Sequence, residues 1–260
     1  MSKKVSVITT TFQDIVHLKE VVNGIKNQNY DNIEYIIVDG GSKDGTVEFL
    51  QSQEGEFEKL PGMELKWISE PDEGIYDAIN KGIRMAQGDI IGFMFDRFVA
   101  EDVISRMVRI IEEEHSDGVH GDLDYVDEDG NIVRHWVMGN SRTMKDGWMP
   151  AHPTLYLKRE VYEKYGFYKT DYRIAADYEF MVRILMDGKL RLSYIHEVVV
   201  YMFYGGTSSA NLGSYVRSFR ESYRALRENH VPFGFLICIK RTMKVLLQFI
   251  SRQQGKKDKE

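Results

Sequence analysis

The sequence predicts an α/β protein with one central, Rossmann-like and mostly parallel sheet, flanking helices and a helical extension at the C-terminus. Short apolar runs alternate with stretches in which apolar residues recur at helical spacing. This alternation favours parallel strands with right-handed crossovers. After a last short strand at residues 198–204 the chain continues as a polar and then a basic amphipathic helix. We therefore expect a large domain over residues 1–209 and an extension over residues 210–260.

The composition is that of a globular protein, with 260 residues of which 43% are hydrophobic and 28% charged. Cys238 is the only cysteine, so we expect no intramolecular disulfide and a reducing, cytoplasmic location. The N-terminal apolar run is too short for a signal peptide. No run reaches the ~18 apolar residues that a membrane-spanning helix needs.

The charge is distributed unevenly along the chain. Residues 240–260 contain seven Lys or Arg and two Asp or Glu, a net of +5, which leaves −11 for residues 1–239. An acidic body argues against general nucleic-acid binding. A basic tail permits attraction to an anionic membrane surface, which would place the protein at the inner face of the cell membrane.

The first four predicted strands cover residues 5–8, 33–38, 65–68 and 90–95. We expect Asp14 to cap the helix after the first strand and Gly88 to end the helix before the fourth in a left-handed conformation. No glycine follows the first strand, so a dinucleotide-binding fingerprint, and with it a nucleotide-dependent oxidoreductase, is disfavoured. The second strand ends at Asp39 and the fourth at Asp96 and Arg97, at the sheet edge where ligands bind in such folds.

The second half predicts a helix over residues 101–115 and a hairpin with strands at 119–125 and 132–137 around Asp129-Gly130. Asp122 and Asp124 share one face of the first of these strands, which we interpret as a solvated face rather than a metal site. A helix over residues 173–187 carries Asp177 in its first turn.

Several segments resemble the signatures of family 2 glycosyltransferases. They read VDGGSKDGT from Val38, EPDEGIYDAINKGIRMAQGD from Glu70, HPT from His152 and AADYEF from Ala175, and the resemblance covers about residues 4–209. It implies a GT-A fold and transfer, with inversion, of a sugar from a nucleoside-diphosphate sugar to an acceptor hydroxyl. It further implies surface polysaccharide biosynthesis on a saccharide or lipid-linked saccharide acceptor.

The resemblance also assigns roles to individual residues. Asp177 is the implied catalytic base, although it could merely cap its helix. Trp148 would be an apolar platform for a sugar ring, and His152 lies in the acceptor region unless it is a structural histidine. The glycine-rich segment 205–209 either folds over the diphosphate or is a plain loop. The base and ribose of the nucleotide would be held by Thr9, Phe12, Asp39, Asp72 and Lys81. A carboxylate such as that of Asp39 can accept the imide N–H of a pyrimidine base, but Asp39 and Ser42 could instead only organise a turn.

One departure from the family concerns the metal. The family usually has two carboxylates after the fourth strand, whereas this chain has Asp96-Arg97-Phe98. Asp96 alone could hold Mg²⁺ or Mn²⁺ together with the diphosphate and water, or Arg97 could supply part of the positive charge. The third alternative is a catalytically impaired protein that binds nucleotide sugars. In every case we expect Asp39, Asp72, Asp96 and Asp177 to meet at one edge of the sheet.

The last helix carries its apolar residues on one face and its basic residues largely on another. A helix of this kind is either an interfacial membrane anchor or packs against the catalytic domain or a second subunit, and the sequence leaves these open. Its apolar face consists of Phe235, Leu236, Ile239, Met243, Leu246, Leu247 and Ile250.

Overall fold

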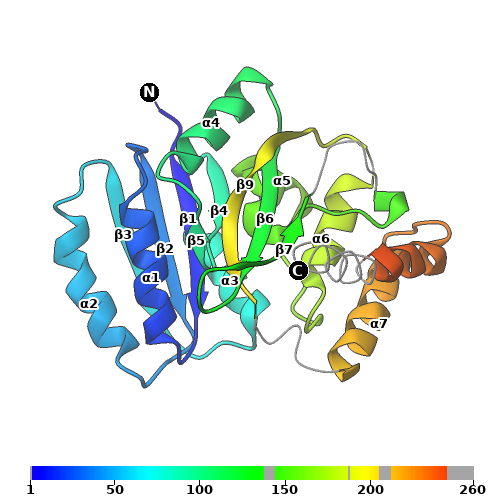
Figure 1. Ribbon diagram of the computed structural model, residues 1–260, viewed down its shortest axis with the longest axis horizontal. Helices are drawn as coiled ribbons and strands as arrows, with labels where there is room; N and C mark the ends of the chain where they lie inside the picture. Colours follow the sequence, from blue (N-terminus) through cyan, green and yellow to red (C-terminus); the bar gives the residue numbers. More distant parts are fainter. Residues whose placement is uncertain (1, 138–143, 187, 205–211, 245–260) are drawn as a thin grey trace, which may run out of the picture.

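A computed structural model describes residues 2–137, 144–186, 188–204 and 212–244 (Figure 1). A curled sheet of nine strands runs through it in the order β3-β2-β1-β4-β8-β6-β9-β5, with β7 paired to β6. The first four strands in this order are parallel: β3 (Met63–Ser69), β2 (Ile33–Asp39), β1 (Val5–Thr11) and β4 (Ile90–Phe93). Every residue of β2 is buried, as expected for a parallel strand covered on both faces.

The other half of the sheet mixes directions. β6 pairs in parallel with β9, whereas β8, β7 and β5 pair antiparallel to their neighbours. The bounds are β6 (Gly118–Val126), β9 (Leu192–Phe203), β8 (Tyr156–Lys158), β7 (Ile132–Trp136) and β5 (Arg97–Phe98). β9 is longer than the short strand that the sequence predicts at residues 198–204.

Helices cover both faces of the sheet and form two hydrophobic clusters with it. One cluster contains residues of α1 (Ile15–Lys26), α2 (Thr46–Phe57) and α4 (Val103–Glu113). The other contains residues of α3 (Ile75–Met85), α5 (Arg159–Tyr165), α6 (Ala176–Leu185) and α7 (Leu212–Glu228). Two short 3₁₀ helices, Met144–Asp146 and His152–Thr154, lie between β7 and β8. The predicted α/β class with one central sheet is confirmed.

Two local predictions are corrected. Helix α3 ends at Met85, where Ala86 turns to an extended conformation, and Gly88 has no left-handed backbone. A side chain on Gly88 would instead meet the backbone nitrogen of Ser6 at 2.6 Å, so this glycine permits close approach to β1. Asp14 does cap α1, since its carboxylate accepts the N–H of His17.

Asp122 and Asp124 do not form a solvated face as the sequence analysis predicts. Both are buried because β7 and β9 flank β6. The hydroxyl of Tyr194 donates to the Asp122 carboxylate at 2.8 Å, and Asp124 lies 2.7 Å from Nδ1 of His135. These partners satisfy buried carboxylates that the sequence pattern alone suggests are exposed.

The C-terminal extension packs onto the rest of the protein. Ala225 and Leu226 of α7 belong to the same hydrophobic cluster as α6, as do Ile237 and Cys238 of a further helix at residues 234–244. The outward face of helix 234–244 carries the predicted apolar residues Phe235, Leu236, Ile239 and Met243, all exposed. Leu246, Leu247 and Ile250 lie outside the described residues, as does the segment 205–209. Among the helices that the structure describes, none has the length and apolar character to cross a bilayer.

Candidate active site

The turn after β2 shows what its aspartate does in the fold. Asp39 is fully buried, and its carboxylate accepts hydrogen bonds from the backbone N–H and hydroxyl of Ser42, at 3.0 and 2.5 Å. The hydroxyl of Ser69, at the end of β3, donates to the same carboxylate at 2.6 Å. Asp39 therefore organises this turn and ties β2 to β3. Contact with a nucleotide base stays a prediction for this residue.

Phe12 and Asp72, two other predicted nucleotide-binding residues, approach each other at Gly40 in this turn. A side chain on Gly40 would lie 2.7 Å from Oδ2 of Asp72 and 3.1 Å from the ring of Phe12. The absence of a Cβ at Gly40 thus lets the two approach each other. Phe12 is 62% exposed and Asp72 is half-buried, so an open aromatic face stands beside a hydrogen-bond acceptor. A planar nucleobase needs both kinds of group.

Thr9 and Lys81 have structural partners. The hydroxyl of buried Thr9 donates to the carbonyl of Met94 at 2.7 Å and accepts from Tyr35, which ties β1 to β4. The ammonium of Lys81 contacts the carbonyl of Pro71 and the carboxylate of Glu70, each at 2.9 Å. Lys81 therefore braces the loop that carries Asp72.

Asp96 and Arg97 follow β4, and their side chains lie in different surroundings. Asp96 is buried and accepts the backbone N–H of Phe203 at 2.5 Å, and it lines a cavity of about 450 Å³ together with His17 and Glu20 of α1. Burial raises the pKa of its carboxyl, which the N–H of Phe203 and the charges of His17 and Arg97 partly oppose. Arg97 is exposed in β5, with its guanidinium over the ring of Tyr201.

A divalent metal at the end of β4 would meet the Asp96 carboxylate, and the carboxylates of Asp14 and Glu20 line the same cavity. Oδ2 of Asp96 is engaged by Phe203, and no hydrogen bond to Oδ1 occurs within the described residues. In the same described part of the chain, no group of three or more His, Cys, Asp or Glu side chains is arranged to hold a metal. This fits a cation such as Mg²⁺, which keeps several waters and takes one or two protein carboxylates plus phosphate oxygens.

Asp177 is half-buried in the first turn of α6, where the helix dipole stabilises its negative charge. The hydroxyl of Tyr76 donates to the carbonyl of Ile174 at 2.7 Å and lies 3.3 Å from Oδ1 of Asp177. Tyr76 belongs to the first turn of α3, directly after the loop of Asp72. The carboxylate of Asp177 is therefore held beside the loop that approaches Phe12.

His152 is stacked on the side chains that end β4. Its ring lies 4.7 Å from that of Phe93 and 5.8 Å from that of Phe95, and Nε2 lies 2.7 Å from the hydroxyl of Tyr168. Burial lowers the pKa of His152, and the charge of Asp177 partly opposes this shift. His152 is thus a packed, neutral histidine within electrostatic reach of Asp177. The ring of Trp148 lies 5.5 Å from that of His120.

Asp39, Asp72, Asp96 and Asp177 are the four residues expected to meet at one edge of the sheet. Asp39 and Asp72 lie on either side of Gly40, and Tyr76 connects the Asp72 loop with Asp177. His152 connects the surroundings of Asp177 with Phe95, the neighbour of Asp96. The side chain of Asp96 itself lines the cavity beside α1. Asp39 ends β2, and Asp72 and Asp96 follow the parallel strands β3 and β4 at the same edge of the sheet. Asp177 instead lies in the first turn of α6, and its link to this edge runs through Tyr76.

Three groups near Asp177 escaped the sequence analysis. Tyr76 lies inside the segment that begins at Glu70 and resembles a family signature, but the sequence analysis assigned it no role. Glu221 of α7 accepts the backbone N–H groups of residues 173–175, and no pattern in the sequence indicates this. The third group is Tyr125, and the guanidinium of Arg134 lies over its ring and over that of Trp136, at 5.4 and 4.9 Å. Burial chiefly raises the pKa of Tyr125, and the charge of Asp177 adds to the shift.

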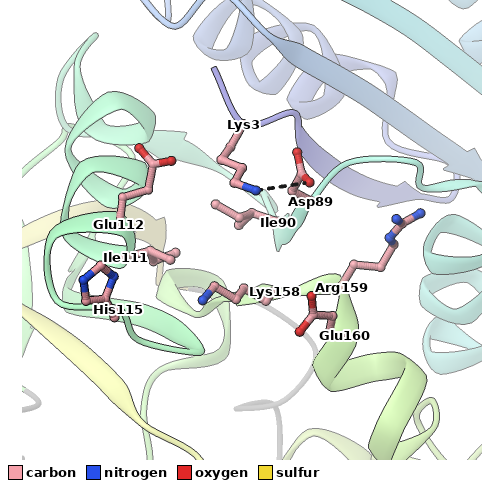
Figure 2. A pocket seen from close by; sticks show the side chains of 9 residues that line it. All are labelled: Lys3, Asp89, Ile90, Ile111, Glu112, His115, Lys158, Arg159 and Glu160. Atoms are coloured by element: carbon pink, nitrogen blue, oxygen red, sulfur yellow. Dashed lines mark ion pairs between the residues drawn. The ribbon is translucent and has the colours of Figure 1, made fainter. Parts of the chain in front are cut away.

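One further cavity lies at this edge of the sheet and another lies at the opposite edge. One of about 560 Å³ lies between residues 73–77 and residues 170–173, with Tyr76 in its wall. Another, of about 380 Å³, lies at the opposite ends of the strands, where β4 begins at Ile90 (Figure 2). Its lining carries charges of both signs, among them the ion pair of Lys3 and Asp89 at 3.6 Å.

The fold and this edge define the class of the protein. The structure resembles that of Staphylococcus aureus TarS residues 1–349 in complex with UDP-GlcNAc, with a TM-score of 0.64, 17% identity, and coverage of 97% of this chain and 73% of that one. It also resembles the Pyrobaculum calidifontis mannosyltransferase PcManGT in complex with GDP-Man and Mn²⁺, with a TM-score of 0.61, 18% identity, and coverage of 94% and 74%. This chain spans 44% of a longer TarS structure. The fold is that of the GT-A glycosyltransferases.

Sequence comparison makes the assignment specific. A model of glycosyl transferase family 2 matches residues 6–174, and the chain belongs to this family. It is 32% identical over 199 residues to an uncharacterized glycosyltransferase of Mycobacterium tuberculosis, covering 69% of this chain and 68% of the relative. It is 28% identical over 208 residues to a PGL/p-HBAD biosynthesis glycosyltransferase of Mycobacterium bovis, covering 78% of each. The protein is therefore a glycosyltransferase.

Proposed function

We propose that this protein transfers a sugar from a nucleoside-diphosphate sugar to an acceptor hydroxyl, with inversion, in the synthesis of a surface polysaccharide. The observation that carries the proposal is the position of Asp177. Its carboxylate is half-buried in the first turn of α6 and lies 3.3 Å from the hydroxyl of Tyr76, beside the Asp72 loop. A base in this position can take the proton of an acceptor hydroxyl next to the donor.

The donor is recognised by a small set of groups. Phe12 offers its ring face to the base, and Asp72 accepts a hydrogen bond from it, while Asp39 and Lys81 hold the two loops in place. The two structural neighbours were solved with UDP-GlcNAc and GDP-Man, which supports a nucleotide-sugar donor of the same general kind.

The reaction is a single displacement. The acceptor oxygen attacks the anomeric carbon as the bond from that carbon to the leaving diphosphate oxygen breaks, and Asp177 receives the hydroxyl proton. Because the attack comes from the side opposite the leaving group, the configuration inverts. A divalent cation at Asp96, when bound, would neutralise the leaving diphosphate. His152 and Trp148 would border the acceptor.

Donor binding and turnover test this proposal separately. Nucleoside diphosphates and their sugars are screened by calorimetry, with and without Mn²⁺, and transfer or donor hydrolysis is then measured for the donor that binds. Asp177→Asn should bind the donor as the parent protein does and lose turnover. Asp129→Asn, an exposed acid in the turn between β6 and β7, is the matched control and should keep both. An active Asp177→Asn variant would remove Asp177 from the mechanism.

A second candidate function is favoured by Arg97 and Phe98, which stand where the family usually has carboxylates. In this alternative the protein binds nucleotide sugars without transferring them. Donor binding without turnover by the parent protein on any acceptor would favour it. Full activity in excess EDTA would show that the reaction needs no divalent metal at Asp96. The proposed sugar transfer itself would still stand.

We also propose that the C-terminal region contacts a membrane surface where a lipid-linked acceptor resides. The exposed residues Phe235, Leu236, Ile239 and Met243 form one face of helix 234–244, and Tyr215 and Val216 of α7 are exposed as well. Lys240 is exposed and lies 3.6 Å from the carboxylate of Asp146, whereas the other two basic side chains of the helix point inward. Arg241 donates to Ser222, and Lys244 donates to the carbonyl of Asp146 at 2.5 Å. The outward surface is therefore apolar, as an interfacial helix requires.

A further inference from the structure

The turn that leads into α6 is held by a side chain from another helix. The residue before α6 is Ala175, which has no side chain able to cap the helix. The carboxylate of Glu221, which belongs to α7, binds the backbone of the turn just before the helix. It accepts the N–H groups of Arg173 at 3.1 Å and of Ile174 and Ala175 at 2.9 Å. One carboxylate thus satisfies three backbone donors immediately before Asp177.

Other side chains of α7 hold the preceding part of the same loop. Glu228 accepts from the ammonium of Lys169 at 2.9 Å and from the hydroxyl of Tyr172 at 3.0 Å. Arg224 pairs with the carboxylate of Asp171 and with Glu228. The loop over residues 169–175 is therefore attached to α7 along its length.

The attachment bears directly on the catalytic group. Tyr76 donates to the carbonyl of Ile174, and Glu221 accepts the N–H of the same residue. The peptide groups leading into Asp177 are thus fixed from two sides, by α3 and by α7. The loop also forms one wall of the cavity of about 560 Å³ beside Tyr76.

We propose that Glu221 is a positioning residue for Asp177, so that α7 completes the catalytic site although it lies outside the proposed catalytic domain of residues 1–209. This inference rests on the proposed role of Asp177 as base. Charge-assisted hydrogen bonds from backbone N–H groups to a carboxylate are short and strong, and three of them define the direction in which the helix leaves the loop. Displacement of a base by about 1 Å is enough to slow a reaction by up to ~100-fold.

The test compares Glu221→Gln with Glu228→Gln. Both variants remove one negative charge of α7 and weaken its hold on the loop, so both should lower the melting temperature. Glu221→Gln keeps the shape of the side chain but replaces one acceptor oxygen by a donor NH₂, which faces the loop N–H groups. We expect it to lower kcat by about tenfold or more with donor affinity unchanged. Glu228→Gln, whose partners are side chains farther from Asp177, should change kcat much less.

Hydrogen exchange provides a readout that needs no activity. The amides of Ile174 and Ala175 should lose protection in Glu221→Gln and keep it in Glu228→Gln, measured on the full-length protein. Equal kcat in the two variants, or amide protection that survives in Glu221→Gln, would overturn the inference. If the parent protein shows no turnover with any donor, the proposed function fails, while the exchange data still decide whether Glu221 holds this turn.

Discussion

At the scale of single residues, Phe12 is the group whose role can be tested most cleanly. It is 62% exposed, so its ring contributes little to folding, yet it stands beside Asp72. Stacking of a base on an aromatic ring is worth about 1–3 kcal/mol, and 1.4 kcal/mol is about a tenfold change in affinity. We expect Phe12→Ala to weaken nucleoside diphosphate binding by about tenfold or more, measured by calorimetry.

Another exposed phenylalanine serves as the control for this variant. Phe233, in the turn before helix 234–244, is 78% exposed and lies outside the group formed by Phe12, Gly40 and Asp72. Phe233→Ala should leave nucleotide affinity unchanged, and both variants should melt near the parent temperature. Unchanged affinity in Phe12→Ala would place the base elsewhere.

His120 predicts a specific sensitivity to acid. Burial lowers its pKa to about 4, whereas an unfolded histidine titrates near 6.5. Between these values the unfolded chain binds the proton and the folded protein does not, so folding stability falls as the pH drops from about 6.5 to 4. The loss attributable to His120 is up to roughly 3 kcal/mol over this range.

Urea unfolding at pH 7 and pH 5 measures this effect. His120→Gln removes the titrating group, so its stability should depend less on pH than that of the parent protein, whatever its absolute value. His115→Gln, which removes an exposed histidine, is the control for the loss of an imidazole. An equally steep loss in His120→Gln would show that other groups cause the acid sensitivity.

The sequence predicted which residues lie at this edge of the sheet better than it predicted their hydrogen-bond partners. Thr9 and Asp39 are at the predicted edge, but both are buried and bonded to groups distant in sequence, such as Tyr35 and Ser69. Burial and such partners depend on how strands pack, which a local motif does not encode. Phe12 and Asp72 meet because Gly40 lacks a side chain, and this is a property of the folded loop.

At the scale of secondary structure, α3 lies unusually close to β1. A Cβ on Gly82 would be 2.5 Å from Cγ2 of Ile8, whereas one on Gly24 in α1 would have no neighbour within 4 Å. Alanine favours the helix over glycine by roughly 0.5–1 kcal/mol, but overpacking a core costs about 1–3 kcal/mol. Gly82→Ala should therefore destabilise the protein by about 1–2 kcal/mol, and Gly24→Ala should stabilise it slightly.

Chemical denaturation of the two variants checks this prediction. Both glycines lie inside helices, so the change in helix propensity on substitution by alanine is the same in the two variants. A stabilised Gly82→Ala would mean that α3 shifts away from β1 at little cost. Since α3 also carries Tyr76, such a shift should appear as changed donor turnover.

The elements themselves were predictable to different degrees. The strand β4 is a continuous apolar run, β1 and β2 are rich in β-branched and apolar residues, and α1, α3 and α4 have clear apolar faces. Helix α2 was not identified, because it buries only Thr46, Leu50 and Phe57 and is otherwise polar. The burial of Asp122 and Asp124 was missed because it depends on β9, which is distant in sequence and joins β6 from the side.

At the scale of the whole molecule, the C-terminal region has two functions in this interpretation. Its inner side holds the loop of Asp177 through Glu221 and adds Ile237 and Cys238 to the core. Its outer side is apolar. The sequence predicted an amphipathic helix but placed its apolar face inward or outward with equal weight, because both a core and a lipid surface accept the same residues.

The outward apolar face leads to a prediction about membrane binding. Leu236 is 54% exposed, so burying its remaining surface in the interface would contribute about 1 kcal/mol, and a charged side chain there would add a desolvation cost. We expect the parent protein to sediment with vesicles that contain phosphatidylglycerol, and Leu236→Glu to reduce this binding by about tenfold or more. Ile132→Glu places the same charge on an exposed apolar residue of β7 and should bind as the parent does.

The same variant decides between a membrane and a second copy of the chain. If the face is a subunit interface, the parent protein should sediment as a dimer in the absence of vesicles, and Leu236→Glu should convert it to a monomer. If the face binds lipid, the oligomeric state should be the same in both proteins, and only vesicle binding should change. If Leu236→Glu changes neither vesicle binding nor the oligomeric state, the apolar face does not bind lipid. The proposed acceptor would then not need to be at a membrane. α7 and helix 234–244 pack together through Phe219 and Phe235. An acceptor presented at the membrane surface would therefore contact the same region that orients Asp177. For this reason turnover should be measured together with vesicle binding.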